Sequence, residues 1–520
     1  MVLSGLGMGG VALSAQPAIS QNGVVNAASL IPPSFAGGSI GRGALFTISG
    51  VRLGSSSGHT AVTLTKNGAV SQVEVLKVAD RRIIAWMPVS APLGSALLMV
   101  STGGESSKPF AVNVSEFNPG LFGRNGEGWG PALADNIEKS GARFANSLSR
   151  PAHPGQRVAL AATGLAATKN VTVILGNRTI QSSLMKSPER EREEITVTIP
   201  SDAPVGCWVP VYILAAPARA SNVVTLTIGS TTPCRAAPVP MDSSQRIGVV
   251  ALSRARLKTL EKTTRPDQAE TILDDARISF IDSGKDPKLT PLRLLPPEGT
   301  CTGYTASFQA NADLATSITS IVSPEGRGLD AGSSLALSRG AQTKSIGEAF
   351  ETPGRYRARL GSSGVPKRKE APPLFLFPGE YLLKGPGGKD VGAFTANFTL
   401  VPSLEWTDRD AIPVVDRSHG VTVHWKDESA SDLVLIIARN IDQIATTIGM
   451  TICAVRAEAG QFTIPPALLA NIPASSDSPA GSYDELAVAA LASRGPVHAS
   501  GLNSGIVMMV SLSQRFVHYR

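Results

Sequence analysis

The chain has 520 residues, 48 basic and 41 acidic, and a formal net charge of +7. Because it contains 51 glycines and 37 prolines and only 17% of its residues are charged, long solvated helices are disfavoured and an all-β multidomain chain is predicted. No run of Lys and Arg exceeds three, and aromatic residues make up only 5%, which argues against a nucleic-acid partner.

The amino terminus resembles an export signal. Residues 1–15 are uncharged, mostly apolar and end in small residues, like the apolar core and cleavage region of a secretory signal, although the positively charged start is missing. We predict a truncated signal segment over 1–19 and a secreted, cell-surface or periplasmic protein. Elsewhere no stretch of about 18 apolar residues occurs, so no membrane-spanning helix is expected.

Two motifs recur at a single offset. The stretch 42–54 aligns with 154–166 and the stretch 86–100 with 198–212, so that Gly43 meets Gly155 and Gly94 meets Gly206, 112 positions apart in both cases. Apolar and polar residues alternate between these motifs, as in half-buried strands. The repeat predicts two immunoglobulin-like β-sandwiches of roughly 100 residues, over 20–116 and 117–229.

The order of these motifs resembles the TIG/IPT class of immunoglobulin-like domains. In addition, "NGVVNAASL" (22–30), "NPGLFGRNGEGWGPALADN" (118–136) and "PGQRVALAATGL" (154–165) are similar to a paired module found in large exported proteins of soil bacteria. The resemblance covers residues 20–229. It implies export and a surface or extracellular binding role, and it supplies no catalytic residues.

Ser39 lies in a Gly-x-Ser-x-Gly pattern that also surrounds the nucleophile of many serine hydrolases. In those enzymes the serine follows a strand and precedes a helix. Here two prolines precede Ser39 and a strand over 44–49 follows it, so we interpret the stretch as a turn that leads into a strand. We therefore predict no catalytic serine at this position.

The remaining chain shows strands without a recognisable catalytic motif. Residues 230–245 are rich in Pro, Ser and Thr and are predicted to be a linker. Over 246–283 we expect a strand, a short helix that starts near Pro266 with Ala269, Ile272 and Leu273 on one face, and a second strand. Seven further strands are predicted at 353–360, 378–385, 392–400, 420–425, 432–438, 461–465 and 505–512. They indicate a β-sandwich-rich region over 246–520, as one domain or as two split near residue 402.

The four cysteines are widely spaced and include no Cys-x-x-Cys pair, which argues against a zinc site or a dithiol redox site. Their even number permits two disulfides in an oxidising compartment, and proximity in sequence favours Cys207 with Cys234 and Cys301 with Cys453. Two other pairings are possible. Four buried free thiols are the alternative.

For two candidate ligand sites in the C-terminal region, a metal site and a phosphate loop, we favour an ordinary structural role over ligand binding. His419 and His424 are five residues apart, so on a strand they point to opposite faces and do not suit a shared metal. The glycine-rich stretch 384–392 lacks both the first glycine and the Ser/Thr of a phosphate loop, and a hairpin turn is predicted there.

Acidic and aromatic residues give two more candidate sites. Calcium could bind among Asp408, Asp410 and Asp416, but their spacing matches no EF-hand, and Arg409 and Arg417 offer charge partners. A glycan platform could use the tryptophans, for which burial within a sandwich is the ordinary role; these are Trp129, Trp406 and Trp425. We predict no metal and no cofactor.

These observations predict an exported, non-enzymatic, multidomain β protein that binds an extracellular protein or glycan. The alternative is a secreted glycan-binding protein or hydrolase in which the repeats are accessory modules and the region from Arg246 onward carries the active surface. DNA binding, by analogy with transcription factors that contain TIG domains, is disfavoured because export is predicted and a basic cluster is missing.

Overall fold

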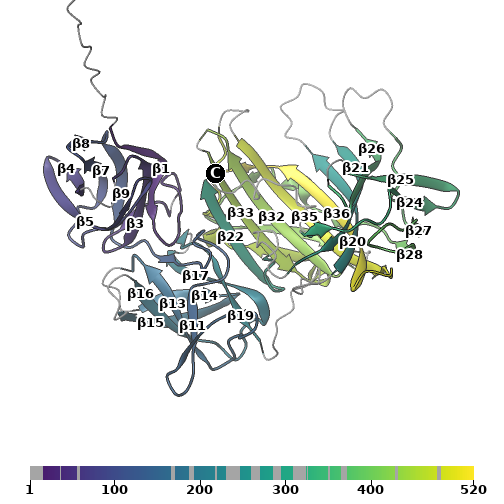
Figure 1. Ribbon diagram of the computed structural model, residues 1–520, viewed down its shortest axis with the longest axis horizontal. Coiled ribbons are helices and arrows are strands. Elements are labelled where there is room, and N and C mark those ends of the chain that lie inside the picture. Colours follow the sequence, from purple (N-terminus) through teal and green to yellow (C-terminus); the bar gives the residue numbers. More distant parts are fainter. Residues whose placement is uncertain are drawn as a thin grey trace, which may run out of the picture.

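Strands make up most of the computed structural model, and they form three large sheets in succession along the chain (Figure 1). The structure describes residues 16–35, 37–54, 59–165, 170–186, 192–216, 219–229, 246–258, 270–284, 294–307, 324, 326–349, 352–364, 372–427, 431–444, 446–476 and 482–520. Most of the predicted signal segment and the whole predicted linker lie outside these residues. The predicted class is confirmed: tandem immunoglobulin-like sandwiches precede a β-rich C-terminal region.

The first sandwich contains nine strands: β1 (Ala18–Asn26), β2 (Ile40–Gly41), β3 (Leu45–Val51), β4 (Thr60–Lys66), β5 (Ala69–Ala79), β6 (Arg82–Trp86), β7 (Gly94–Thr102), β8 (Glu105–Ser106) and β9 (Phe110–Ser115). They follow the order β1-β3-β6-β5-β4-β7-β9-β2, with β8 beside β7. Alternate residues such as Phe46, Ile48, Val62 and Leu64 are buried in one core. The alternation of apolar and polar residues in the sequence therefore reflects strands with one buried face.

The second sandwich contains β10 (Gly120–Leu121), β11 (Ala134–Ile137), β12 (Arg143–Ala145), β13 (Arg157–Thr163), β14 (Asn170–Leu175), β15 (Arg178–Lys186), β16 (Glu193–Thr198), β17 (Gly206–Ala216), β18 (Arg219–Ala220) and β19 (Val224–Ile228). Its central order, β13-β16-β15-β14-β17, repeats the order β3-β6-β5-β4-β7 of the first sandwich. The repeat found in the sequence is therefore a repeat of topology.

Equivalent glycines hold equivalent turns in the two copies. Gly43 and Gly155 have φ of 68° and 80°, a left-handed conformation that favours glycine. Their amides donate to the carbonyls of Met87 and Ile199, at 2.9 and 2.8 Å. These acceptors are again 112 positions apart, so the turn before the first core strand is built in the same way twice.

The C-terminal region is organised around a 13-stranded sheet. Its strands are β20 (Arg246–Lys258), β21 (Thr271–Asp282), β22 (Thr300–Ser307), β23 (Arg327–Gly328), β24 (Ser334–Arg339), β25 (Gln342–Glu348), β26 (Arg355–Ser363), β27 (Gly379–Gly385), β28 (Phe394–Leu400), β32 (Leu433–Asp442), β33 (Thr447–Val455), β35 (Ser482–Pro496) and β36 (Ser504–Phe516). Their order is β22-β33-β32-β35-β36-β20-β21-β26-β25-β24-β27-β28, with β23 beside β21. Strands from both sides of residue 402 thus belong to one sheet.

Smaller elements cover one end of this sheet. They are β29 (Glu405–Trp406), the 3-10 turn η5 (Arg409–Ala411), β30 (Val414–Val415), β31 (Val421–Lys426), η6 (Ala457–Ala459), β34 (Gln461–Ile464), α1 (Pro466–Leu469) and β37 (His518–Tyr519). All seven strands predicted between 353 and 512 coincide with strands of the structure. The domain boundaries that we drew from the sequence stay predictions.

The short helix predicted near Pro266 is wrong in its described part. Ile272 and Leu273 lie in β21, where they pair with Arg256 and Ala255 of β20. Pro266 and Ala269 lie outside the described residues. Continuous pairing of β20 with β21, from Arg246 opposite Asp282 to Leu257 opposite Thr271, overrides a local apolar spacing that fits a helix equally well.

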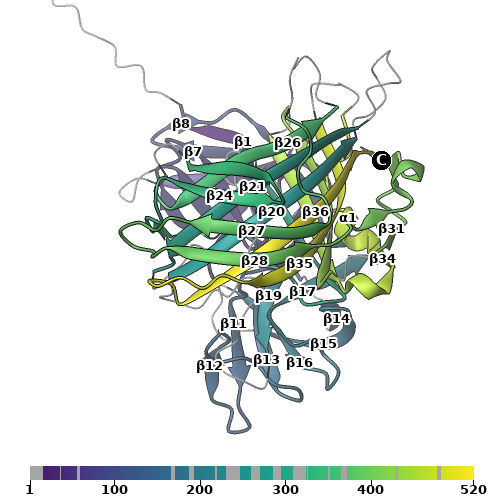
Figure 2. The same cartoon turned by 90° about the vertical axis from the view of Figure 1, so that its right-hand side faces the viewer.

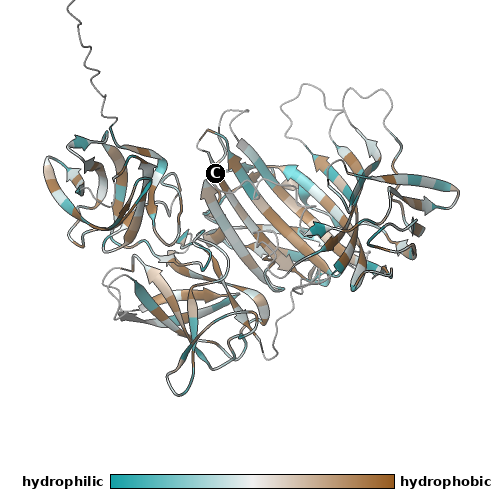
Figure 3. Cartoon of the chain, in the orientation of Figure 1, coloured by the Kyte–Doolittle hydropathy of each residue, from teal (hydrophilic) through white to brown (hydrophobic). Residues whose placement is uncertain are grey.

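The large sheet is buried on both faces over much of its area. One face of β20, β32, β33, β35 and β36 packs against Trp129, Cys207 and Trp208 of the second sandwich. The other face of β32, β33 and β35 packs against the smaller elements. The sheet also curls, so that β28 approaches β35 (Figure 2). A third apolar cluster, which includes Phe280, Phe394 and Val507, packs inside the curl. Consequently long stretches of the central strands β32, β33 and β35 are apolar (Figure 3).

Candidate functional site

The predicted Cys301–Cys453 disulfide is present. The two cysteines lie directly opposite each other in β22 and β33 and are both buried. Of the three possible pairings of four cysteines, only the pairing that also joins Cys207 to Cys234 contains this bond. Cys234 lies outside the described residues, so the second bond stays a prediction.

Ser39 belongs to the joint between the two sandwiches. Its side chain is buried, and its Oγ lies 3.0 Å from Oγ of Ser115. Its carbonyl accepts a hydrogen bond from Nδ2 of Asn118. Among the described residues no histidine and no carboxylate hydrogen-bonds to the hydroxyl, so Ser39 has no base there to activate it as a nucleophile.

The same joint uses residues from all the stretches that carry the family resemblance. Nδ2 of Asn26 donates to the carbonyl of Asn118 at 3.3 Å, and the Leu45 amide donates to Oγ1 of Thr163 at 2.8 Å. A Cβ on Gly164 would lie 2.3 Å from the Asn118 carbonyl, so only glycine fits there. The motif residues therefore fix how one sandwich meets the next.

The two histidines contact different carboxylates, and only His424 lies on a strand, β31. Asp408 accepts hydrogen bonds from Nε1 of Trp406 at 2.7 Å and from the amide of His424 at 3.0 Å, and its other oxygen lies 2.6 Å from Nδ1 of His424. His419 instead contacts Asp416, at 3.3 Å. They do not share a metal position.

Asp416, Ser418 and His419 lie together but do not form a catalytic triad. The Ser418 hydroxyl donates to Oδ1 of Asp416 at 2.6 Å and therefore accepts from His419 Nδ1, 2.8 Å away. A nucleophilic serine would donate to the histidine instead. The Ser418 hydroxyl and amide lower the pKa of the Asp416 carboxyl to about 2.

The third carboxylate of the predicted calcium loop faces a set of cations. Asp410 contacts Lys258 at 2.9 Å, Arg409 at 3.7 Å and Arg515 at 3.8 Å. The hydrogen bond from Lys258 lowers the pKa of the Asp410 carboxyl. The three aspartates thus have three separate sets of partners. Within the described ranges, no group of three or more His, Cys, Asp or Glu residues could hold a metal ion.

The three candidate tryptophans are buried rather than displayed. Trp129 packs edge-on against Tyr304 of β22, with 6.1 Å between the ring centroids, and so joins the second sandwich to the large sheet. Trp406 and Trp425 lie in the cluster beneath the smaller elements, where Nε1 of Trp425 donates to the carbonyl of Ala457 at 2.7 Å. They form no shared glycan platform.

The glycine-rich stretch 384–392 is the predicted hairpin turn between β27 and β28. The amide of Lys389 donates to Oδ2 of Asp330 at 3.1 Å, and the amide of Asp390 donates to the Asp330 carbonyl at 3.0 Å. Because a carboxylate already occupies the position where an anion would sit, this turn does not suit a phosphate.

A pocket of about 520 Å³ lies where the smaller elements meet the large sheet. It is lined by Arg254 and Arg256 of β20, Ser513 of β36, Leu376, Pro378, residues 401–407, Arg409 and Asp410. Because Arg254, Arg256 and Arg409 all line it, we name it the arginine pocket. Its size lies within the range of about 300–1,000 Å³ that is typical of small-molecule sites.

The floor of the arginine pocket comes from the parallel pair β20 and β36. Side chains at alternate positions share a face, so Arg254 and Arg256 follow Val250 and Leu252, which belong to the apolar cluster inside the curled sheet. In the paired strand, Ser513 lies opposite Arg256. One face of the sheet therefore changes from apolar to cationic along β20.

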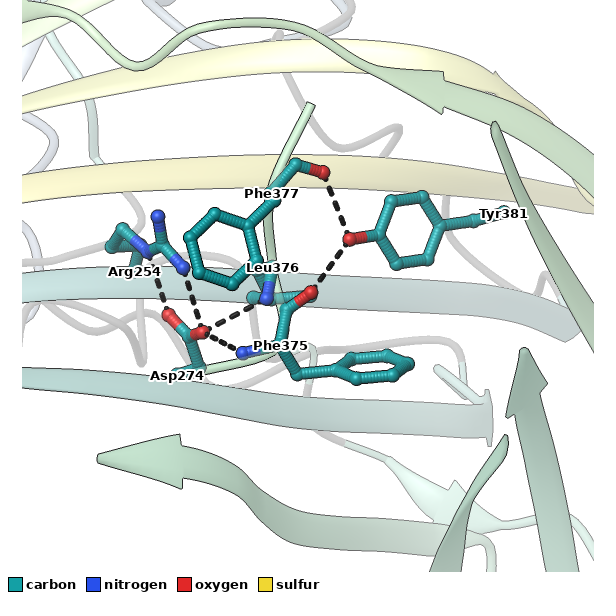
Figure 4. A network of polar contacts seen from close by, with 6 residues as sticks. All are labelled: Arg254, Asp274, Phe375, Leu376, Phe377 and Tyr381. Carbon is teal, nitrogen blue, oxygen red and sulfur yellow. Dashed lines mark hydrogen bonds and ion pairs between the residues drawn. The ribbon is translucent and has the colours of Figure 1, made fainter. Parts of the chain in front are cut away.

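Arg254 is fixed by a buried network (Figure 4). Its Nε and Nη2 donate to the two oxygens of Asp274, both at 2.8 Å. Oδ2 of Asp274 also accepts the amides of Phe375 and Leu376, at 2.7 and 2.8 Å. This carboxylate therefore ties β20, β21 and the wall segment of the pocket together, and it holds Arg254 by a bidentate pair.

The other cations of the arginine pocket share few carboxylates. Glu270 contacts both Arg256, at 3.5 Å, and Arg409, at 2.7 Å. Nη1 of Arg409 is buried and has no hydrogen-bond partner in the part of the chain that the structure describes. A buried donor of a charged group without a partner indicates a place for water or a ligand.

Sequence reasoning missed this pocket. The signal is the alternation of Arg254, Arg256 and Lys258 in "SRARLK", directly after an apolar run. On a strand, that alternation places the three cations on one face. A strand was predicted at this position, but the three cations were not interpreted as one face of it. The contributions of 376–378 and 401–410 are visible only in the fold.

None of the helices in the described part of the chain is long and apolar enough to span a membrane. No family model matches the chain, and no curated protein matches it. The assignment to the TIG/IPT class therefore stays a prediction.

Similar solved structures include two SGBP-B proteins. One, from the Bacteroides ovatus mixed-linkage glucan utilization locus and in complex with a mixed-linkage heptasaccharide, has 13% identity over 86% of this chain and 92% of its own, with a TM-score of 0.17. The other, from a complex xyloglucan utilization locus of Bacteroides uniformis, has 12% identity over 74% and 97%, with a TM-score of 0.18. Domains 5–6 of the S-layer protein SbsC show 16% identity over 42% and 100%, with a TM-score of 0.19. At such low TM-scores these similarities carry no argument about function.

Proposed function

We propose that this chain is an exported, non-enzymatic binding protein whose partner is an extracellular glycan or protein. The observation that carries the proposal is the buried Cys301–Cys453 disulfide. Disulfides persist in oxidising compartments such as the periplasm, the cell surface and the medium, and they are rare in the cytosol. The signal-like start of the sequence is consistent with such a location.

The roles of the candidate catalytic residues support binding rather than catalysis. Ser39 is used in a domain joint, and the Ser418 hydroxyl donates a hydrogen bond to the Asp416 carboxylate. Asp410 is occupied by cations. Among the residues that line the arginine pocket, Asp410 is paired with cations and Glu405 is exposed, while several arginine and hydroxyl donors face the pocket, which suits recognition of an anionic ligand.

A peptide map of the full chain, recovered from its native host without reduction, tests the location. We expect a Cys301–Cys453 linked peptide in the medium or surface fraction and a mature start near Gln16. Free thiols in a cytosolic fraction would overturn export. The same preparation is then screened against glycans and surface proteins for binding, and against glycans for released products. Release of products from a glycan would show that the protein is a hydrolase and would overturn the proposed non-enzymatic function.

A further inference from the structure

We propose that the arginine pocket binds the carboxylate of an acidic sugar, and that Arg256 and Arg409 are the residues that contact it. This inference rests on the proposed extracellular binding function and names a ligand class and a site for it. It follows from the charge balance of the pocket, from unused hydrogen-bond donors and from the mixed polar and apolar walls.

The charge balance favours an anion. Glu270 is shared by Arg256 and Arg409, and Asp410 is shared by Lys258 and Arg515. Four cations therefore face two carboxylates. A third carboxylate, the exposed Glu405, also lines the pocket and forms no ion pair within the described residues. With Glu405 included, the four cations in and beside the pocket outnumber the three carboxylates, and a bound carboxylate would neutralise this excess of positive charge.

Donors for a carboxylate are available in the pocket. Arg256 has a side-chain exposure of 46%, and its ion pair with Glu270, at 3.5 Å, exceeds the length of a good hydrogen bond. Nη1 of Arg409 is buried and has no hydrogen-bond partner among the described residues. Guanidinium groups match planar carboxylates through two parallel N–H···O bonds. Asp274 occupies Nε and one N–H of Nη2 of Arg254, so the fork of donors that Arg254 would offer to a second carboxylate is already in use.

The walls suit a sugar ring rather than a bare anion. Pro378, Pro402 and Leu404 line one part of the pocket and offer apolar surface to the C–H faces of a pyranose. Ser403 and Ser513 line it as well and carry hydroxyls for hydrogen bonds to sugar hydroxyls. Apolar walls with a few placed polar groups are typical of specific small-molecule sites.

Calorimetric titration of the full-length oxidised protein tests the proposal. The probes are trimers of galacturonate, mannuronate and glucuronate, each beside its methyl ester, which keeps the sugar and removes the charge. We expect at least one uronate to bind, its ester to bind at least about tenfold more weakly, and affinity to fall as salt rises. Sodium acetate at equal ionic strength should bind far more weakly.

Variants then locate the site. We expect Arg256→Ala and Arg409→Ala each to weaken uronate binding about tenfold or more, because each removes a charge-assisted hydrogen bond. Arg359→Ala, which removes an arginine that pairs with Asp275 and does not line the pocket, should change affinity less than about twofold. Arg256 is exposed, so its variant keeps the test valid even if Arg409→Ala lowers stability.

The outcomes separate this inference from the proposed function. Equal binding of uronate and ester, or unchanged binding in Arg256→Ala, overturns the inference. Failure of all uronates on a disulfide-bonded, exported protein that binds another surface partner overturns the inference alone. Free thiols in a cytosolic protein overturn the proposed function first.

Discussion

At the scale of single residues, Asp274 is the most demanding position in the fold. It is fully buried, neutralises Arg254 and accepts the backbone amides of Phe375 and Leu376 (Figure 4). A buried charge that loses its partner costs about 3–5 kcal/mol. We therefore expect Asp274→Asn to lower the free energy of unfolding of the C-terminal region by about that amount. Urea unfolding measures it, from the transition in which the C-terminal region unfolds.

Asp275 provides the matched control for Asp274→Asn. It is the neighbouring residue of β21, but its ion pair with Arg359 is partly exposed, with 42% exposure of the arginine side chain. An exposed pair contributes about 0–1 kcal/mol. Asp275→Asn should therefore have little effect. Equal losses in the two variants would show that the buried network has no special role.

Asp416 offers a test by pH. Its pKa is lowered from 3.8 to about 2, first by the hydroxyl and then by the amide of Ser418. A carboxyl whose pKa is lowered in the folded state stabilises that state at every pH above its unfolded pKa. This stabilisation is lost as the pH falls through the folded-state pKa. In the unaltered protein we expect the NMR resonance of the Ser418 amide to titrate with a midpoint near pH 2. In Ser418→Ala, where the carboxyl resonance of Asp416 is observed directly, we expect its midpoint to move toward 3.8.

Ser418→Thr keeps the hydroxyl and controls for this titration. It should keep the low midpoint of Asp416, because the hydroxyl still donates to the carboxylate. If the midpoint is the same with and without the hydroxyl, the hydrogen bond does not set the acidity.

At the scale of secondary-structure elements, local pattern was enough for some strands and not for others. The strands β27 and β28 alternate apolar and polar residues between glycines and prolines, so the sequence alone identifies them. The start of β21 does not alternate clearly, and Ile272 and Leu273 fit a helix as well. Its state is decided by β20 and β26 on either side, and no local signal contains that information.

The edge strand β22 depends on its disulfide. Within the sheet it pairs only with β33, and Cys301–Cys453 closes a sequence separation of 152 residues. Closing a loop of this length contributes on the order of 4–5 kcal/mol in the chain-entropy account. We expect the double variant Cys301→Ala, Cys453→Ala to lose amide protection in β22 before β36, measured by hydrogen exchange.

Strand β36 is the internal control for this exchange experiment. It lies between β35 and β20 and is hydrogen-bonded on both sides, so it should keep the protection of the whole sheet. Loss of protection at the same rate in β22 and β36 would mean that the sheet opens only as a unit and that the disulfide does not hold the edge strand in particular.

At the scale of the whole molecule, the repeat was predictable and the arrangement of the parts was not. Identity at the 112-residue offset, at Gly43 and Gly155, directly reflects one topology used twice. The arginine pocket instead joins β20 to segments that lie more than 100 positions later, at 376–378 and 401–410. A single sequence does not say which distant segments meet, so only the cationic strand could have been found in advance.

The placement of the two sandwiches depends on a few buried polar contacts. Nδ2 of Asn118 donates to the carbonyls of Gly37 and Ser39, and Oγ1 of Thr163 accepts the Leu45 amide. The apolar cores of the two sandwiches do not include these residues. Loss of the polar contacts should therefore affect the joint more than either core.

We expect the double variant Asn118→Ala, Thr163→Val to loosen this joint while both sandwiches stay folded. Each buried backbone group that loses its partner costs about 1–3 kcal/mol, and here those groups all lie between the sandwiches. Small-angle scattering should show a larger radius of gyration, and the Leu45 amide should exchange faster. Asn113→Ala, an exposed asparagine of β9, should change neither quantity. An unchanged scattering profile with a protected Leu45 amide would mean that apolar contacts alone hold the sandwiches in place.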